Sequence, residues 1–216
     1  MITKHKIKNP KDNSLKSGHG VFISFEGVDG SGKSTQARRL AESLGNEAVL
    51  LREPTESQFG QIIRKMALSE RHRPLLEHRL FIQDREWDLK HNIIPALNSG
   101  KIVILDRYIV SNLAYQGALG ISLDAIMKDN REFPWPDLII VLNIDVNTAL
   151  QRIKNSRKNI EVFEEKNFLS KVNDIINAIN LPNVLYIDGK LDEDILAETI
   201  LDLANEIIEQ RSTLLF

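Results

Sequence analysis

The sequence contains no cysteine and no long apolar run. Without cysteine there can be no disulfide, no thiolate metal site and no cysteine nucleophile. This composition fits a reducing compartment, so we expect a cytoplasmic protein. The longest apolar runs, Ile102–Leu105 and Leu138–Leu142, fall far short of the roughly 20 residues that a bilayer-spanning helix needs. We therefore expect no membrane partner.

The chain also lacks an excess of charge of either sign. Its 28 Lys and Arg residues stand against 30 Asp and Glu residues, which gives a net charge of -2 at pH 7. Such a chain has no broad attraction for a polyanion, so we expect no nucleic-acid partner. Any binding of phosphate must then depend on a local arrangement of cations and backbone N–H groups.

The first twenty residues form a basic segment with five lysines and one aspartate. This segment lacks the apolar core of about 7 to 15 residues that a secretory signal requires. We expect residues 1–20 to be a flexible extension. Residues 21–216 are enough to bury a sizeable core, so we expect them to form a single domain.

From Val21 onward, short apolar segments alternate with longer amphipathic ones, which predicts βαβ units. The short segments are rich in Val, Ile and Leu, as is typical of parallel strands that are covered on both faces. We predict an α/β fold with three layers, in which helices flank a five-stranded parallel sheet. The predicted strands span residues 21–25, 48–51, 101–105, 138–143 and 184–187. The predicted helices span residues 33–44, 58–68, 75–98, 111–119, 148–153, 165–179 and 192–209.

A glycine-rich motif directly follows the first predicted strand and opens the first predicted helix. It matches the pattern G-x-x-x-x-G-K-[ST] and comprises Gly27, Val28, Asp29, Gly30, Ser31, Gly32, Lys33 and Ser34, with Thr35 next in the chain. In this context the glycines let successive backbone N–H groups point at phosphate oxygens, and the helix presents its positive dipole end. We therefore expect residues 27–35 to bind ATP or GTP, with Lys33 on the β and γ phosphates. The alternative is a glycine turn that merely connects strand and helix.

Asp106 follows the third predicted strand, at the position of a Walker B carboxylate. Together with the Ser34 hydroxyl it is a candidate ligand of Mg²⁺, which prefers oxygen donors and would also keep nucleotide oxygens and water. The alternative is that Asp106 caps the next helix. Arg107 follows directly, in the crevice where open α/β sheets bind ligands.

More cations lie near the predicted carboxyl ends of the strands than one triphosphate requires. They are Arg52, Arg107, Arg152, Lys154, Arg157 and Lys158. Two phosphate-bearing substrates that face each other need such cations, because their mutual repulsion must be neutralised. An acceptor phosphate is already largely ionised near pH 7, so no general base is needed. The alternative is that these residues form surface ion pairs.

The polar stretch of residues 152–166 is expected to be a mobile lid. Its closure would exclude water and would bring Arg157 or a neighbour onto the transferring phosphoryl group. Arg152 is the alternative candidate for this role.

Several motifs together resemble the thymidylate kinase family. They are residues 25–36, the sequence Arg52-Glu53-Pro54-Thr55, Phe81 with Arg85 four residues later, Asp106-Arg107-Tyr108, Ser111 and the sequence Ala114-Tyr115-Gln116-Gly117. The motifs occur in the order of the family and extend from Val21 to about Leu185. The resemblance implies transfer of the γ-phosphoryl group of ATP to dTMP, with Mg²⁺, by a homodimer.

The resemblance also implies roles for individual residues. The dTMP site would comprise Arg52, Pro54, Phe81, Arg85, Arg107, Ser111, Tyr115 and Gln116. Phe81 would stack on thymine and Arg85 would donate to its O4, which agrees with a helical i, i+4 spacing that puts both side chains on one face. Tyr115 would crowd a ribose 2′-OH, and Asp29 would approach the 3′-OH or the metal. Lys33, Arg107, Arg157 and Asp29 would be the catalytic residues.

The residues also leave other interpretations open. Phe81 could belong to the core and Arg85 could be a solvated helix charge. The enzyme could act on another acceptor, such as a deoxynucleoside or a different pyrimidine monophosphate, or the chain could be a nucleotide-dependent switch. The family often shows Leu-Asp after the fourth strand, where this chain has Leu142-Asn143, so that segment is assigned no catalytic role. The histidines, including His78, are read as surface or structural residues.

Overall fold

The computed structural model of the chain describes residues 20–67, 73–156 and 162–213. Its sheet has five parallel strands in the order β2-β3-β1-β4-β5. The strands are β1 (Val21–Glu26), β2 (Ala48–Arg52), β3 (Ile102–Asp106), β4 (Leu138–Asn143) and β5 (Val184–Asp188). The five predicted strands are therefore confirmed, each to within one residue at either end.

Helices fill most of the described segments between the strands. They are α1 (Lys33–Leu44), α2 (Gln58–Ala67), α3 (Pro74–Asp88), α4 (Ile94–Asn98), α5 (Ile109–Ala118), α6 (Leu123–Asp129), α7 (Val146–Ser156), α8 (Val162–Ala178) and α9 (Glu193–Thr213), with a 3₁₀ turn η1 (Gly45–Glu47) and a π-helical turn η2 (Leu89–Ile93). The π turn joins α3 to α4 where the prediction has one continuous helix, and it lies just before Pro95, which lacks an N–H for the helical ladder. Helix α6 was not predicted. It is short, and Ile126 is its buried residue, so its apolar pattern is weak. None of the described helices is long and apolar enough to cross a membrane.

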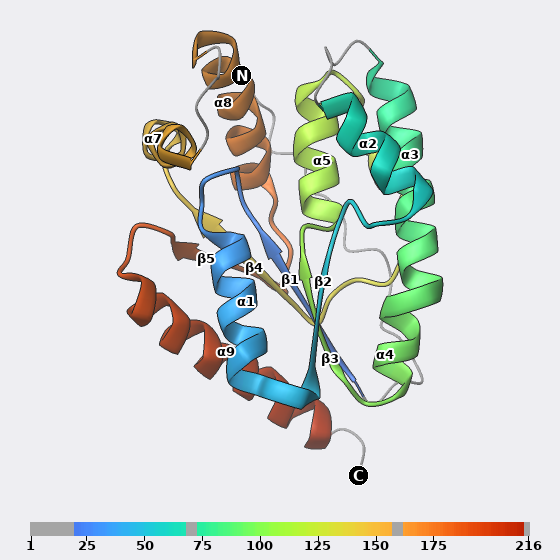
Figure 1. The fold of residues 1–216 in the computed structure, drawn as a ribbon, viewed down its shortest axis with the longest axis vertical. Helices are drawn as coiled ribbons and strands as arrows, with labels where there is room; N and C mark the ends of the chain where they lie inside the picture. The colour runs from blue at the N-terminus through green and yellow to red at the C-terminus, as the bar shows by residue number, and fades with distance from the viewer. Residues whose placement is uncertain (1–19, 68–72, 157–161, 214–216) are drawn as a thin grey trace.

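Two apolar clusters, one on each face of the sheet, give the fold its three layers. Successive strand residues point to opposite faces, so Ile102 and Ile104 of β3 pack into the cluster that includes α1 and α9. Val103 and Leu105 pack into the other cluster, with η2, α4, α5, α7 and α8. Figure 1 shows α1 and α9 on one side of the strands and α3, α4 and α5 on the other. The predicted α/β architecture is confirmed.

The carboxyl ends of β1, β3 and β2 lie side by side. The register places Asp106 of β3 beside Phe25 of β1 and beside Arg52 of β2. The segments that follow these three strands therefore begin at one edge of the sheet, which is where open α/β sheets bind ligands.

Candidate active site

The glycine-rich loop forms a tight turn between β1 and α1. Gly27, Gly30 and Gly32 have φ angles of 135°, 80° and 96°, which L side chains rarely adopt. A Cβ at Gly27 would lie 2.7 Å from the carbonyl oxygen of Leu142, and one at Gly30 would lie 2.6 Å from that of Ala149. All three glycines are therefore required by backbone conformation, and Gly27 and Gly30 also by close approach. The loop leaves the first N–H groups of α1 available to an anion.

Lys33 projects from the start of α1 beneath this loop. Its Nζ donates to the carbonyl oxygen of Val28 at 3.2 Å and lies 3.7 Å from Oδ1 of Asp29. Burial, together with the Arg107 charge, lowers the pKa of Lys33 to about 8. Phosphate groups beside Lys33 would favour its protonated form, so the ammonium group is suited to an anionic ligand.

Ser34 and Asp106 meet as the sequence predicts. The Ser34 hydroxyl donates to Oδ2 of Asp106 at 2.5 Å. In the described part of the chain, Oδ1 of Asp106 is buried and has no hydrogen-bond partner. Asp106 does not cap α5, because the cap residue of that helix is Tyr108 and no side-chain cap bond forms there. A hydroxyl beside a carboxylate with an unused oxygen can hold a small hard cation.

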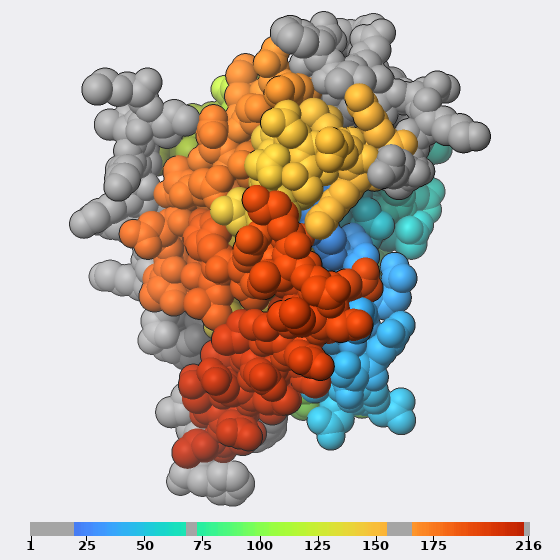
Figure 2. Space-filling model, turned by 90° about the vertical axis from the view of Figure 1, so that its left-hand side faces the viewer, coloured from blue at the N-terminus to red at the C-terminus, as the bar shows by residue number. Residues whose placement is uncertain are grey.

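A cleft of about 560 Å³ lies above the glycine-rich loop, a size within the range of small-molecule sites. Asp29, Gly30, Gly32, Lys33, Ser34, Thr35, Arg52 and Arg152 are among its lining residues. In Figure 2, blue atoms of the early chain are visible between the yellow atoms of α7 and the orange-red atoms of the C-terminal part. Six of the nine residues predicted to bind a nucleotide therefore line a cleft of sufficient size.

Arg152 of α7 reaches back to this cleft. Its Nη1 donates to the carbonyl oxygen of Gly189 at 3.0 Å and to that of Ser31 at 3.3 Å. A lid arginine expected from the sequence thus contacts the glycine-rich loop. Arg157, the other candidate, lies outside the described residues. Residues 1–19 of the predicted extension and the centre of the predicted lid also lie outside the described residues. Helices α7 and α8 extend into the range of the predicted lid from its two ends.

Glu26, which the sequence analysis assigned no role, organises the turn after β3. Its carboxylate accepts the backbone N–H groups of Tyr108 at 2.9 Å and Ser111 at 3.0 Å, together with the Ser111 hydroxyl. Glu26 is the last residue of β1, and it thereby provides acceptors for N–H groups at the start of α5. Directly before Tyr108, Arg107 is held at a φ of 77°, an unusual value for a residue other than glycine. A charged residue at the end of an otherwise apolar strand is the signal that could have identified Glu26.

The Arg107 side chain points toward the glycine-rich loop. Its Nη2 donates to Oδ1 of Asp29 at 2.5 Å and to the Tyr115 hydroxyl at 3.3 Å, and its Nη1 lies 3.3 Å from the Ser111 hydroxyl. The backbone N–H of Asp29 also donates to the Tyr115 hydroxyl, at 3.1 Å. Four predicted site residues are therefore brought together, and Asp29 connects Lys33 to Arg107.

Arg52 and Pro54 lie at and after the end of β2. The Arg52 side chain is 65% exposed, and its Nε lies 3.7 Å from Oδ2 of Asp106. The Pro54 carbonyl oxygen accepts from Arg64 at 2.8 Å, and the Glu53–Pro54 peptide bond is cis. Arg52 thus extends a cation into the cleft beside the candidate metal ligand.

Phe81 and Arg85 lie on α3, one helical turn apart, but their environments differ. Phe81 is partly exposed and belongs to neither apolar cluster, so its alternative role as a core residue is not supported. Arg85 is only 1% exposed, and its Nε donates to both oxygens of Glu53 at 3.1 Å. The Arg85 guanidinium also lies 4.5 Å from the centre of the Tyr108 ring. The alternative in which Arg85 is a solvated helix charge is therefore wrong.

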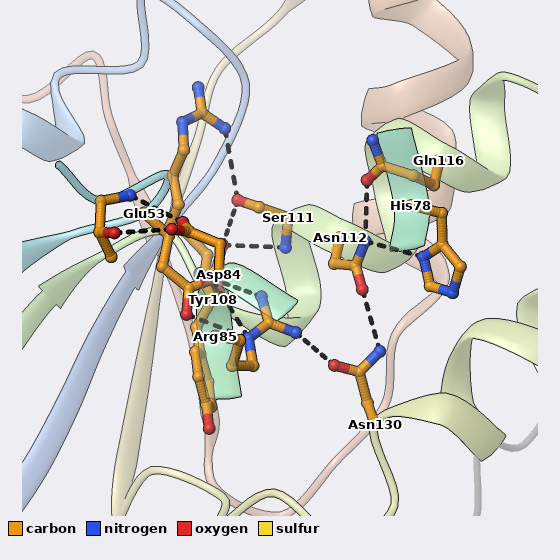
Figure 3. A network of polar contacts seen from close by, with 12 residues as sticks. Glu53, His78, Asp84, Arg85, Tyr108, Ser111, Asn112, Gln116 and Asn130 are labelled. Atoms are coloured by element: carbon orange, nitrogen blue, oxygen red, sulfur yellow. Dashed lines mark hydrogen bonds and ion pairs between the residues drawn. The ribbon is translucent and has the colours of Figure 1, made fainter. Parts of the chain in front are cut away.

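Gln116, the last predicted acceptor residue, belongs to a buried polar network that the sequence analysis did not identify (Figure 3). Gln116 donates to Glu77 and accepts from Asn112, which in turn contacts His78 and Asn130. The four-residue spacing of Asn112 and Gln116 was visible in the sequence, but their partners come from α3 and from the end of α6. Asp84 forms a neighbouring group, in which it accepts from Thr55 and Ser57.

The sequence of this chain is similar to those of known proteins. Residues 25–200 match the family model described as thymidylate kinase. The thymidylate kinase of Brachyspira hyodysenteriae is 38% identical over 191 residues, which cover 87% of this chain and 94% of the relative. That of Xylella fastidiosa is 35% identical over 195 residues, covering 89% and 90%. The probable thymidylate kinase of Pyrococcus abyssi is 38% identical over 196 residues, covering 82% and 95%.

Replacement of Glu26 by Gln tests the buried carboxylate. Burial raises its pKa from 4.5 to about 7, so between these values the folded state holds a proton that the unfolded chain releases. The resulting stability is fully present below about pH 4.5 and is lost as the pH rises through 7. Because Gln does not titrate, the free energy of unfolding of Glu26→Gln should fall less between pH 5 and 8 than that of the wild type, by on the order of 2 to 3 kcal/mol.

Urea unfolding at several pH values measures this difference. Glu42→Gln, at an exposed position of α1, is the control and should follow the wild-type pH dependence. Parallel curves for the wild type and Glu26→Gln would show that Glu26 does not take up a proton on folding.

Proposed function

Because the chain belongs to the thymidylate kinase family, we propose that it transfers the γ-phosphoryl group of ATP to dTMP, which yields dTDP and ADP. The observation that carries this proposal is the position of Asp29. Its carboxylate lies 3.7 Å from Lys33, on the donor side, and 2.5 Å from Arg107, on the acceptor side. Cations for two anionic substrates are therefore arranged around one point, as in-line transfer between two phosphates requires.

On the donor side, residues 27–35 would hold ATP. The N–H groups of the loop and of the first turn of α1 would face the phosphates, and the Lys33 ammonium would bridge the β and γ groups. Ser34 and Asp106 would hold Mg²⁺, which is supported by their contact and by the unpartnered Oδ1 of Asp106. When bound, this ion supplies neutralisation of the charge on the phosphate oxygens.

On the acceptor side, Arg52 and Arg107 would bind the dTMP phosphate. Pro54 and Ser111 would border that phosphate, since Ser111 contacts Arg107 directly. Tyr115 would leave no room for a ribose 2′-OH, because its hydroxyl is held by Asp29 and Arg107.

The remaining acceptor residues would recognise the base. Phe81 is partly exposed and free of the core clusters, which suits stacking on thymine. Arg85 would donate to its O4, and Gln116 would lie at its N3 side. Both side chains are buried among polar partners, so they would offer hydrogen bonds in fixed directions.

Transfer itself would require positioning and charge neutralisation rather than a general base. The dTMP phosphate is already ionised near neutral pH, so its oxygen can approach the γ-phosphorus directly once Lys33 and Arg107 offset the repulsion. Asp29 would hold Arg107 in place and approach the sugar 3′-OH. We also propose that residues 152–166 close as a lid and that Arg157 then contacts the transferring group, a role for which Arg152 is the described alternative.

We further propose that the protein is a cytoplasmic homodimer. Helices α2 and α3 pack together at one side of the molecule (Figure 1). They carry the exposed side chains of Ile62 (44%), Leu75 (64%) and Leu76 (42%), whose burial would be favourable. Sedimentation should give the mass of two chains, and a mass of one chain at micromolar concentration would refute the dimer.

Acceptor dependence tests the proposed activity. With ATP and Mg²⁺, formation of ADP should require dTMP and should proceed in step with formation of dTDP. UMP should react more slowly, because Tyr115 would meet its 2′-OH. Parallel assays with dTMP, dUMP, UMP and thymidine distinguish the candidate acceptors. Slow ATP hydrolysis that is the same with and without acceptors would instead indicate a nucleotide-dependent switch.

Replacement of Lys33 by Ala tests the donor site. Loss of the ammonium group should lower kcat by about 10² to 10³, the cost typical of removing one such electrostatic contact. The KM for dTMP should change little, because Lys33 lies on the ATP side. Lys128→Ala, at an exposed position of α6, is the matched control. A near-normal kcat for Lys33→Ala would contradict the assignment.

A further inference from the structure

Three buried amide side chains connect Arg85 to Glu77. Asn130, Asn112 and Gln116 are each at most 3% exposed, and they come from the end of α6 and from α5. Figure 3 shows Asn112 at the centre of this group, with Gln116, His78 and Asn130 around it. Because Arg85 and Gln116 are the two residues proposed to form hydrogen bonds with the acceptor base, the amides between them couple the two.

Arg85 sets the direction of each hydrogen bond along this row of three amides. A guanidinium can only donate, so the atom of Asn130 that faces it is the oxygen. The Asn130 amide nitrogen then faces Oδ1 of Asn112 at 2.9 Å and the carbonyl oxygen of Ile126 at 2.8 Å. Both contacts need a donor, which the nitrogen supplies.

Glu77, at the other end of this row of amides, imposes the same direction. With its oxygen turned to Asn130, Asn112 directs its nitrogen to Oε1 of Gln116 at 2.9 Å. The Gln116 nitrogen then donates to Oε1 of Glu77 at 3.1 Å, because an amide nitrogen can only donate. Each amide therefore has a single orientation that satisfies its neighbours, and a flipped amide would place like groups against each other.

His78 completes the surroundings of Asn112. Its Nδ1 lies 3.4 Å from the Asn112 nitrogen, and its Nε2 lies 3.0 Å from Oδ2 of Asp129. Since the Asn112 nitrogen donates, Nδ1 must accept. The proton of the neutral ring is then on Nε2, where Asp129 accepts it.

We propose that His78 and Asn130 are positioning residues for the acceptor base: they hold the Asn112 amide in one orientation and thereby fix the groups that Gln116 and Arg85 offer to the base. This inference rests on the proposed function. Thymine presents an acceptor at O4 beside a donor at N3. A side-chain amide that can flip would exchange donor for acceptor at that edge and would lose the match.

Two substitutions of His78 place different groups against Asn112. In His78→Asn the side-chain oxygen can occupy the position of Nδ1, whereas His78→Leu places a methyl group there. Both remove the contact with Asp129, so that loss is common to the pair. We expect His78→Leu to raise the KM for dTMP about fivefold or more, because a buried donor loses its acceptor. His78→Asn should stay within about twofold of the wild type.

In both variants, kcat at saturating dTMP and the KM for ATP should remain near the wild-type values, because the ATP site is separate. A general loss of folded protein would lower the apparent kcat instead and would leave the KM for dTMP unchanged. An equal KM for dTMP in the Leu and Asn variants would overturn the role of His78.

Asn130→Asp keeps the size of the side chain and replaces its donor by an acceptor. It can still accept from Arg85, but it opposes Oδ1 of Asn112 and the carbonyl oxygen of Ile126. We expect a KM for dTMP about tenfold or more above that of the wild type, with the KM for ATP unchanged. Asn205→Asp, at an exposed position of α9, is the matched control and should behave as the wild type.

The outcomes separate this inference from the proposed function. If the unsubstituted chain forms no ADP in response to dTMP, the proposed function fails, and this inference fails with it. If the wild type is active and Asn130→Asp, shown to be folded by circular dichroism, binds dTMP normally, the role of Asn130 alone is refuted. If Asn130→Asp does not fold, the His78 pair decides the proposal.

Discussion

The arrangement of the site depends on one buried carboxylate. Glu26 ends β1 directly before the glycine-rich loop, and it accepts hydrogen bonds from the first residues after β3. One side chain therefore joins the segment proposed to hold ATP to the segment that carries Arg107. Burial of this carboxylate is unfavourable, as its raised pKa of about 7 indicates. The surrounding donors offset that cost only while the turn after β3 keeps its conformation, so the carboxylate and the turn specify each other.

A second buried charge, the Arg85 guanidinium, also joins separate elements. Arg85 of α3 pairs with Glu53 after β2 and contacts Asn130 after α6, so it links three parts of the chain. Buried ion pairs add little net stability, because desolvation of both charges opposes their attraction. Loss of one partner, in contrast, leaves an uncompensated buried charge. The pair is thus better understood as fixing the orientation of the groups around Arg85 than as a source of stability.

Much of the fold followed from local patterns. The strands were predicted to within one residue, because runs of Val, Ile and Leu covered on both faces leave a clear signal. The contact of Ser34 with Asp106 agrees with the prediction, because the motif puts Ser34 at the start of a helix and Asp106 ends a neighbouring strand. The i, i+4 spacing correctly placed Phe81 and Arg85 on one helix. Helix α6 and the π turn before Pro95 were missed, since a short helix with little buried surface and a local change of helical pitch leave little trace in an apolar pattern.

The sequence by itself determined the order of strands and helices, the glycine-rich loop and the residue types at the edge of the sheet, because each depends on neighbours in the chain. Only the tertiary structure decided which of these residues meet. The contacts of Glu26 with Ser111, of Asp29 with Arg107 and of Asn112 with Asn130 join residues from separate elements. Whether a polar side chain is solvated or fixed by partners depends on what the fold packs against it. For that reason the burial of Arg85 and the direction of the amide chain could not be obtained from spacing alone.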